Sequence, residues 1–323
     1  MPDAGEQFKL GVLKDAKEWD RAVDASPQGS IFCKSFFLNS LETDYVCYVV
    51  FLKEKKLAGV CVLLDENNLP RIAPYVFGVY EGFMFFDTEK DNHSRVKFEF
   101  EISEFLIKEL LKKYNKLSIC HSYNYKDLRA FQWYNYNEPE KSRFKIDLRY
   151  TGILNILNLN FNEYLKNIRK CRKQEYQYAL SRYKVTVRES DDVEALDNLH
   201  KLTLKRSGGH ITALESNLLK KISLACLKNK KARLLIAFKG TKEISANLFI
   251  FDDKRGYYLF GANHPGYRDT GASTYLLLEQ IKYCMSKGLE EVDFIGVNSP
   301  NRGDYKLSFN GRLEPYFETH FNI

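Results

Sequence analysis

The stretch from residue 256 to residue 321 constrains the fold more than any other part of the chain. An aromatic run at residues 257–261 predicts a strand, and a loop rich in glycine and proline follows it. Apolar residues at helical spacing predict a helix that begins at Ala272 and ends before the C-cap residue Gly288. Residues 292–298 predict another strand, then a short helix and a last strand. The stretch therefore predicts a mixed α/β domain.

The loop before this helix predicts an anion-binding site. Residues 268–273 read Arg-Asp-Thr-Gly-Ala-Ser. Small residues let backbone N–H groups converge at a helix N-terminus, where the helix dipole favours an anion. Arg268 adds a fixed positive charge, so Arg268, Gly271, Ala272 and Ser273 together predict a pyrophosphate site. A plain glycine-containing turn would explain the same residues, and that alternative stays open.

Three segments carry a family resemblance. The loop resembles the acyl-coenzyme A loop of the GNAT acyltransferases, Q/R-x-x-G-x-G/A, although Ser273 departs from the usual last residue. Residues 305–311 are similar to the F/Y-K-x-x-F-G segment of FemABX-like and related double-GNAT transferases. Residues 127–136 resemble a segment of bacterial double-GNAT proteins of surface polysaccharide assembly. The resemblance spans essentially the whole chain.

The resemblance implies an α/β fold with mixed sheets and two tandem GNAT-like domains. Residues 1–150 show the GNAT order of strands and helices without a phosphate loop, so we expect a degenerate domain that forms one wall of the substrate site. Residues 151–323 repeat the order with the loop, and we expect them to hold the acyl-coenzyme A site. The length of 323 residues suits two domains of this size.

Two aromatic residues of the first half are candidate substrate-binding residues, Tyr75 and Trp133. Tyr75 lies in a turn after a proline. Trp133 stands among other aromatic residues, which are buried in most proteins, so a core cluster is one interpretation. A surface on which a nucleobase stacks is the other, and stacking on a flat ring contributes about 1–3 kcal/mol per base.

The middle of the chain carries a basic helix, predicted for residues 163–183. Basic residues crowd its first turns, where they oppose the helix dipole, so a nearby anion would relieve the helix. A solvated basic face is the alternative. Arg169 and Arg172 are our candidates because residues three apart share a helix face. The resemblance implies that they lie beside the phosphates of a nucleotide-linked acceptor.

The resemblance also implies where the chemistry occurs. In GNAT proteins two parallel strands, here residues 257–263 and 292–298, separate, and the thioester lies between them. We expect a backbone N–H of Phe260 or Ala262 to stabilise the oxyanion, while Lys306 either assists it or binds an acidic group of the acceptor. The acceptor amine must lose a proton. The sequence selects no single base among the candidates Glu81, His264, Asp293 and Tyr305.

Composition excludes several classes of protein. No apolar stretch approaches the length of about 18 residues that a membrane span needs, and no signal-peptide core opens the sequence. Seven scattered cysteines without C-x-x-C spacing predict reduced thiols and a cytoplasmic protein. We expect no metal, because no His and Cys cluster has zinc spacing. The net charge of +7 suits a phosphate-bearing substrate or a nucleic acid.

Two enzymatic functions follow. The first is an N-acyltransferase that moves an acyl group from acyl-coenzyme A to the amino group of a dTDP- or UDP-linked amino sugar, for O-antigen or capsule synthesis. No nucleic acid is expected as its partner. The second is a FemABX-type transferase that uses aminoacyl-tRNA to extend a peptidoglycan precursor. A binding protein that kept the fold without catalysis is a third interpretation.

Overall fold

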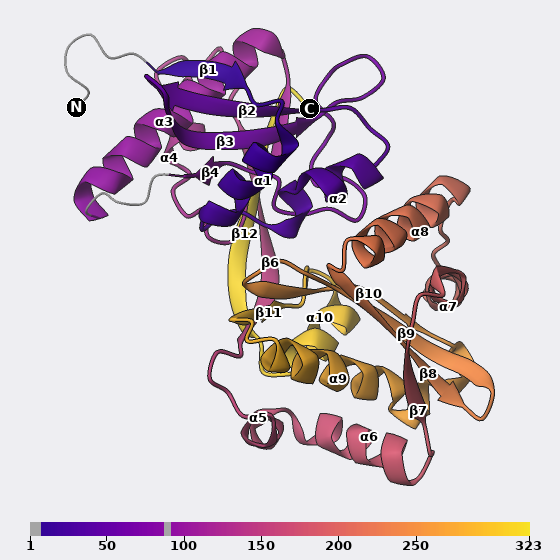
Figure 1. Ribbon diagram of the computed structural model, residues 1–323. Coiled ribbons are helices and arrows are strands. Elements are labelled where there is room, and N and C mark those ends of the chain that lie inside the picture. Colours follow the sequence, from indigo (N-terminus) through magenta and orange to yellow (C-terminus); the bar gives the residue numbers. More distant parts are fainter. Residues whose placement is uncertain (1–7, 87–91) are drawn as a thin grey trace. The chain divides into compact units, whose positions relative to one another are not determined.

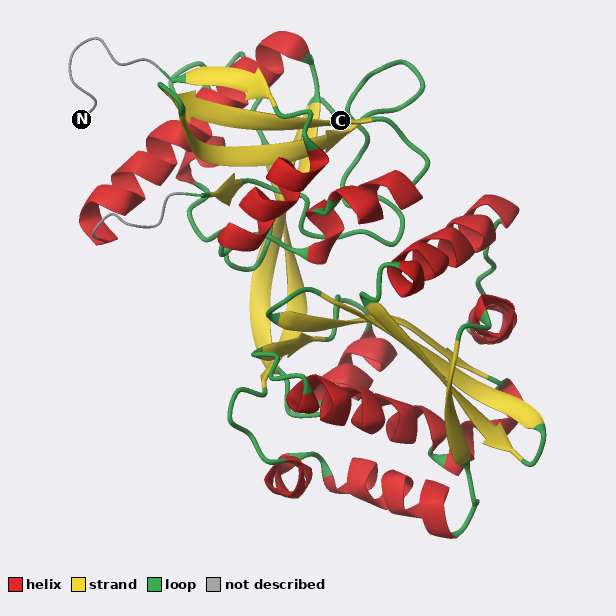
Figure 2. Cartoon of the chain, viewed as in Figure 1, coloured by secondary structure: helices red, strands yellow, loops and turns green. Residues whose placement is uncertain are grey.

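The computed structural model describes residues 8–86 and 92–323 (Figure 1). The chain divides into two compact units, one formed by Met1–Arg149 with Pro315–Ile323 and the other by Tyr150–Glu314. Each contains β-sheet and helices, so the predicted α/β class is confirmed (Figure 2). No helix in the described part of the chain is long and apolar enough to cross a bilayer. All seven cysteines are free, and Cys171 is the one that is not buried.

The first unit contains a four-stranded antiparallel sheet in the order β1-β2-β3-β4. Its strands are β1 (Lys9–Val12), β2 (Tyr45–Leu52), β3 (Lys55–Leu63) and β4 (Met84–Phe85). The first unit also contains β5 (Leu117–Cys120), α1 (Ala16–Ala25), η1 (Ile31–Cys33), α2 (Ser35–Ser40), α3 (Asn92–Lys113) and α4 (Arg129–Gln132). The apolar runs at residues 47–52 and 57–64 predict a hairpin, and the structure forms it as β2 and β3.

Features of the nearby sequence explain where α1 begins and which of its faces is buried. The side chain of Asp15 accepts a hydrogen bond from the Glu18 N–H, which satisfies a donor that the helix itself leaves free. Trp19 and Val23 are four residues apart and both are buried, so they form the inner face. The Trp19 indole N–H also donates to the carbonyl of Cys33 at 2.7 Å. The sequence predicts a helix that begins in residues 15–23 with Trp19 facing inward, and the structure confirms it.

The second unit is built on the larger sheet, whose strand order is β5-β12-β6-β11-β10-β9-β8-β7. Its strands are β6 (Lys145–Asn155), β7 (Thr186–Ser190), β8 (Ala232–Lys239), β9 (Lys242–Phe251), β10 (Arg255–Asn263), β11 (Glu291–Asp293) and β12 (Arg312–Phe321). β6 and β12 each contain residues of both units.

Helices cover both faces of β7 to β10 (Figure 1). The helices of the second unit are α5 (Phe161–Asn167), α6 (Lys170–Ser181), α7 (Val193–Arg206), α8 (Ala213–Lys228), η2 (Pro265–Thr270), α9 (Ala272–Ser286) and α10 (Pro300–Leu307). α7 packs against β9 and β10 on one face, and α9 packs against β8, β9 and β10 on the other. The predicted helix from Ala272 is confirmed as α9.

The basic helix predicted for residues 163–183 is wrong as a single element. Ile168 and Arg169 have extended ψ angles of 160° and 135°, and they separate α5 from α6. The break buries the Ile168 side chain, which is 3% exposed, in the core of the second unit. The free energy gained by burying this apolar side chain favours the turn over a continuous helix. Arg169 therefore precedes the first turn of α6.

The strand predicted for residues 292–298 is also shorter than expected. Regular pairing ends at Asp293, and Ile295 and Gly296 have φ angles of 44° and 58°. A left-handed conformation stops a strand, and it is unfavourable for a β-branched residue such as Ile295. The segment then returns to β6, where the Val297 N–H donates to the Tyr150 carbonyl at 3.0 Å.

Candidate active site

The two parallel strands of the second unit separate at a defined residue pair. β10 and β11 pair through Arg255 and Glu291, then through Gly256 and Val292, and last through Tyr257 and Asp293. β10 continues to Asn263, paired along its other edge with β9 and interrupted by a bulge between Tyr258 and Phe260. We call the diverging segments, residues 258–263 and 294–298, the β10–β11 fork (Figure 1).

Asp293 shapes the turn on one side of the fork. Its side chain is fully buried, and its Oδ1 accepts hydrogen bonds from the Thr151 hydroxyl at 2.5 Å and the Ile295 N–H at 2.8 Å. A buried carboxylate is costly unless such donors compensate it. The bond to Ile295 also stabilises a backbone conformation that costs on the order of 1–3 kcal/mol.

Lys306 contacts the same turn from α10. Its ammonium donates to the carbonyls of Ile295 at 2.5 Å and of Gly296 at 3.3 Å. Burial lowers the pKa of Lys306 to about 8, and the neighbouring charge of Asp293 opposes this shift. The ammonium also lies 5.3 Å from the centre of the Tyr258 ring. A positive charge that is lost just above neutral pH therefore lies beside the fork.

The beginning of α9 is covered by α6. The Glu175 carboxylate accepts hydrogen bonds from the Thr274 hydroxyl and from Arg172, each at 2.5 Å. Gly271 has a φ of 74°, and a Cβ built on it would lie 2.3 Å from the Glu175 carbonyl oxygen. Gly271 and Ala272 are buried, whereas Arg268 is exposed. An anion could therefore reach Arg268, but α6 covers the backbone at Gly271.

Comparison with known proteins agrees with this geometry. Residues 162–307 match the acetyltransferase (GNAT) domain family. The matched residues lie within the second unit. No curated protein matches the chain.

Solved structures extend the likeness of fold to the whole chain. The structure titled FemX is similar over 96% of both chains, with 14% identity and a TM-score of 0.68. A tandem GNAT protein from the clavulanic acid biosynthesis pathway is similar over 98% of both chains, with 9% identity and a TM-score of 0.55. The C-terminal domain of a putative lysylphosphatidylglycerol synthetase from Agrobacterium fabrum has 9% identity and a TM-score of 0.53, over 94% of this chain and 91% of that one. These likenesses show the fold alone.

The cofactor residues predicted from the loop lie around the start of α9, within the residues that match the GNAT domain family. Ser273 and Tyr305 are neighbours, because the Tyr305 hydroxyl lies beside the side chains of Ser273 and Thr274. Burial raises the pKa of Tyr305, so its hydroxyl keeps its proton at neutral pH and is suited to donate rather than to accept a proton. Its role in catalysis stays a prediction.

Phe260 and Ala262 lie on β10 within the fork. Both side chains are buried, and Phe260 packs on His200 of α7 with ring centres 5.9 Å apart. They pair with Leu248 and Ala246 of β9. The predicted role of their backbone N–H groups in stabilising an oxyanion stays a prediction.

The two candidate arginines of the basic segment have acidic partners within their own unit. Both terminal nitrogens of Arg169 bond to the Asp304 carboxylate, at 2.8 and 2.9 Å. Arg172 donates to Ser308 at 2.9 Å, and its guanidinium lies 4.7 Å from the Tyr305 ring centre. The expectation that both share one helix face is wrong, because Arg169 precedes α6. The negative charge near the basic start of α6 therefore comes at least in part from the carboxylate of Asp304, a residue of the chain itself.

Of the remaining candidates, His264 directly follows the first segment of the fork, and the others belong to the first unit. His264 caps η2, since its Nδ1 accepts the Gly266 N–H at 3.2 Å. Glu81 and Tyr75 are buried in the first unit, and the Tyr75 hydroxyl donates to the Phe32 carbonyl at 3.1 Å. Trp133 is 49% exposed, so the interpretation of Trp133 as a core residue is wrong.

Trp133 lies on a surface rather than in the core because its neighbours on the chain form a short helix. Phe131, two residues earlier in α4, takes the buried position and is 1% exposed. The ring of Trp133 packs on Phe100 at 5.3 Å, and the Arg129 guanidinium lies 5.5 Å from it. A role of Trp133 in substrate stacking stays a prediction.

Sequence reasoning missed Thr151, Glu175 and Thr274. Thr151 bonds to Asp293 across 142 positions of sequence, and Thr274 bonds to Glu175 across 99. No local pattern of residues links such pairs. The glycine and the helix start at Ala272 are visible in the sequence, but the packing of α6 over them is not.

One group of side chains has the composition of a metal site. Ligand atoms of Asp147, Glu318 and His320 lie within 4.8 Å of one another in the first unit. Lys145 donates to Asp147 at 2.7 Å, and Arg149 donates to Glu318 at 3.1 Å. These two cations already balance the carboxylates, so the donor set is a poor one for a metal ion.

Proposed function

We propose that this protein is an N-acyltransferase, which transfers an acyl group from an activated donor to the amino group of an acceptor. The observation that carries the proposal is the β10–β11 fork in a domain that matches GNAT acetyltransferases, with Lys306 beside it. The separated strands offer backbone groups that no longer serve the sheet. Such groups can orient an acyl carbonyl before the reaction begins.

The proposed reaction is addition and elimination at the acyl carbon. The acceptor amine, once it has lost a proton, forms a bond to the carbonyl carbon, and the carbonyl electrons move to its oxygen. A backbone N–H of Phe260 or Ala262 stabilises this oxyanion. Two of the three Lys306 donors bond to Ile295 and Gly296, so one remains for the oxyanion among the described contacts. Collapse then breaks the bond to the leaving group, which takes up a proton.

The candidate bases have different roles in the proposed reaction. Asp293 holds the turn and the charge of Lys306, so we propose that it is a positioning residue rather than the base. Tyr305 retains its proton at neutral pH and fits a proton donor to the leaving group. Glu81 stays a candidate base from the first unit. General base catalysis contributes typically 10² to 10⁴-fold to the rate, and positioning contributes the larger part.

We propose acyl-coenzyme A as the donor. The match of residues 162–307 to an acetyltransferase domain and the exposed charge of Arg268 support this choice. We propose a dTDP- or UDP-linked amino sugar as the acceptor, as in O-antigen or capsule synthesis. The support for this acceptor is the sequence resemblance of residues 127–136, with Tyr75, Trp133 and Arg169 as candidate contacts.

A second candidate function is aminoacyl transfer of the FemABX type. Two observations favour it. The fold resembles FemX over 96% of both chains, and α6 covers the backbone at Gly271, where a pyrophosphate would approach. A donor without a pyrophosphate at this position, such as an aminoacyl ester of tRNA, does not need access to the backbone N–H groups at Gly271.

Calorimetric titration with coenzyme A distinguishes the two donors. We expect wild-type protein to bind at micromolar concentration and Arg268→Ala to bind at least tenfold more weakly. Arg206→Ala is the matched control, because Arg206 is also an exposed arginine of the second unit. No binding by wild type, together with transfer from aminoacyl-tRNA, would establish the second candidate. Failure of transfer from both donors to any amine would refute the acyltransferase proposal.

A further inference from the structure

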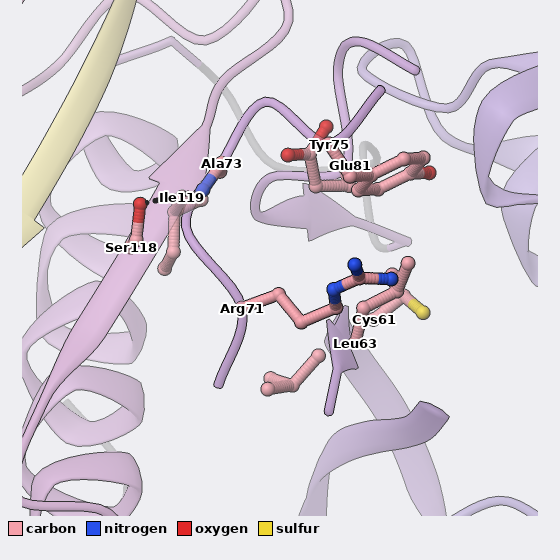
Figure 3. Close-up of a pocket in the computed structure, with 9 residues that line it drawn as sticks. Cys61, Leu63, Arg71, Ala73, Tyr75, Glu81, Ser118 and Ile119 are labelled. Atoms are coloured by element: carbon pink, nitrogen blue, oxygen red, sulfur yellow. Dashed lines mark hydrogen bonds between the residues drawn. The ribbon is translucent and has the colours of Figure 1, made fainter. Parts of the chain in front are cut away.

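The first unit contains a small pocket whose lining belongs entirely to that unit (Figure 3). Apolar residues of β3 and β5 form much of the wall. Four residues bring polar groups to it, Arg71, Tyr75, Glu81 and Ser118. The space open to water-sized groups is about 10 Å³, which corresponds to roughly one such group. The pocket lies outside residues 162–307, and two residues of its lining, Tyr75 and Glu81, are also candidates for the reaction proposed above.

Glu81 has an unusual environment in this pocket. The residue is 4% exposed, and neither carboxylate oxygen has a hydrogen-bond partner in the described part of the chain. Figure 3 shows its carboxyl group beside the Tyr75 ring. Buried carboxyl groups normally find donors, because an unsatisfied buried polar group costs on the order of 1–3 kcal/mol. A ligand with N–H donors would supply the missing bonds.

The groups around Glu81 do not balance its charge. Burial raises the pKa of the thiols and the phenol that face it, which are therefore neutral at pH 7: Cys33, Cys61, Cys120 and Tyr75. His121 is neutral as well, because burial lowers its pKa to about 3. Glu318 is the acidic neighbour, and it bonds to Arg149. A cationic group is therefore the complementary occupant.

The charge of Arg71 restricts the kind of ligand further. Arg71 lines the same pocket and is an exposed residue, so the pocket has a positively charged lining residue that solvent reaches. A ligand that carried only positive charge would be repelled by Arg71, whereas a ligand with an anionic group next to its amine would satisfy both residues. An ammonium group is close to water in size, and it carries three donors.

We propose that this pocket binds the primary ammonium group of a small zwitterionic amine, the class that includes free amino acids. Glu81 receives the ammonium, the Tyr75 ring lies beside it, and Arg71 pairs with the anionic group of the ligand. The proposal is tested by ligand binding and proton release alone, so its failure can be distinguished from a failure of the proposed acyl transfer, which is measured as activity.

Binding is coupled to a proton. Burial raises the pKa of Glu81 to about 8, and the charge of Glu318 adds to this effect. At pH 7 Glu81 is therefore mostly protonated. When the ammonium binds, the Glu81 proton leaves to the buffer, and the resulting carboxylate pairs with the ligand cation. Affinity should therefore rise with pH up to about 8 and then level off.

Calorimetric titration of the full chain with glycine tests the proposal. We expect binding in the millimolar range or tighter, with release of about one proton per glycine at pH 7, measured in two buffers of different ionisation enthalpy. Trimethylglycine keeps both charges but has no N–H donors and a larger head group, so it should not bind. Acetate should not bind, and methylammonium should bind more weakly than glycine.

Two variants complete the test. Glu81→Gln keeps the shape of the side chain and should abolish both glycine binding and proton release. Arg71→Gln should weaken glycine at least fivefold while leaving methylammonium unchanged or stronger. A thermal unfolding scan checks that Glu81→Gln remains folded. Equal glycine binding by wild type and Glu81→Gln, or no binding of either amine by folded wild type, would overturn the proposal.

Discussion

Asp293 and Lys306 hold the same peptide segment from its two polar sides. Asp293 accepts the Ile295 N–H at 2.8 Å, and Lys306 donates to the Ile295 carbonyl at 2.5 Å. Ile295 has a φ of 44°, which a β-branched residue rarely adopts. The two charges therefore maintain a strained turn at the end of β11, and the same arrangement brings the Lys306 ammonium to the fork.

Replacement of Lys306 by Met should lower kcat by about 10²-fold, the typical effect of removing one donor to an oxyanion. The dissociation constant of the donor should change little, because Lys306 lies beside the reacting carbonyl rather than at the α9 start. Steady-state kinetics and donor titration measure the two effects. A variant with unchanged kcat would refute the role of Lys306 in stabilising the oxyanion.

The pH dependence of kcat provides an independent readout of Lys306. In wild type, activity should fall above a pH of about 8, where the buried ammonium loses its proton. This descending limb should be absent from the residual activity of Lys306→Met. A limb that persists unchanged in the variant would assign the titration to another group.

Asp293→Asn should move that descending limb to lower pH. The Asp293 charge opposes the lowering of the Lys306 pKa, so its removal lets the pKa fall further. Thr151→Val is the matched control, since it removes a hydrogen bond to Asp293 and keeps the charge. A pH–rate profile of both variants is the measurement, and equal shifts in both would contradict the electrostatic explanation.

Lys306 should also make stability depend on pH. Its pKa is about 8 in the folded chain and 10.5 ordinarily, so the unfolded chain binds more protons between these values. The free energy of unfolding of wild type, compared with Lys306→Met, should therefore rise as the pH rises from 8 to 10.5, by up to about 3 kcal/mol. Urea unfolding at several pH values measures this difference, and a constant difference would contradict the buried charge.

Gly271→Ala should destabilise the fold because the new Cβ would meet the Glu175 carbonyl oxygen at 2.3 Å. Gly240→Ala is the matched control, since Gly240 also has a positive φ of 61° but open space around it. The control should cost about 1 kcal/mol from backbone conformation, and Gly271→Ala should cost about 1–3 kcal/mol more from the overlap. Equal costs in chemical denaturation would show that α6 moves away from α9 easily.

Trp133→Ala should change stability much less than Phe131→Ala. Trp133 is 49% exposed, whereas Phe131 is 1% exposed and packs on the rings of Phe83 and Phe144. Truncation of the buried ring should cost about 3–5 kcal/mol, and truncation of the exposed one about 1 kcal/mol. If Trp133→Ala then weakens the acceptor without loss of stability, the predicted stacking role gains support.

Much of the local structure could be predicted from the sequence because its signals lie close together along the chain. The cap at Asp15, the inward Trp19 and the glycine before Ala272 act within one or two helical turns. The apolar runs of β2 and β3 likewise specify their own strands, since alternating or continuous burial is a property of the segment. The GNAT order of elements follows from these local signals.

At the candidate site, local sequence signals did not predict which groups the residues contact. The residues Arg169, Arg172 and Gly271 were assigned to phosphates because a cation and a glycine at a helix start are typical of anion sites. In the structure their nearest groups are Asp304, Glu175 and Ser308, which belong to other parts of the second unit. A residue type indicates which partner it can take, and it does not indicate whether the chain itself supplies that partner.

The sequence by itself determined the α/β class, much of the helix and strand order, and the glycine-containing loop before α9. The tertiary structure decided that β11 ends at Asp293, that α6 covers Gly271, and that Glu81 is buried without a donor. The physical reason is the range of the interactions. Helix caps and periodic burial act between neighbours in sequence, whereas desolvation and the pairing of buried polar groups depend on segments that only folding brings together.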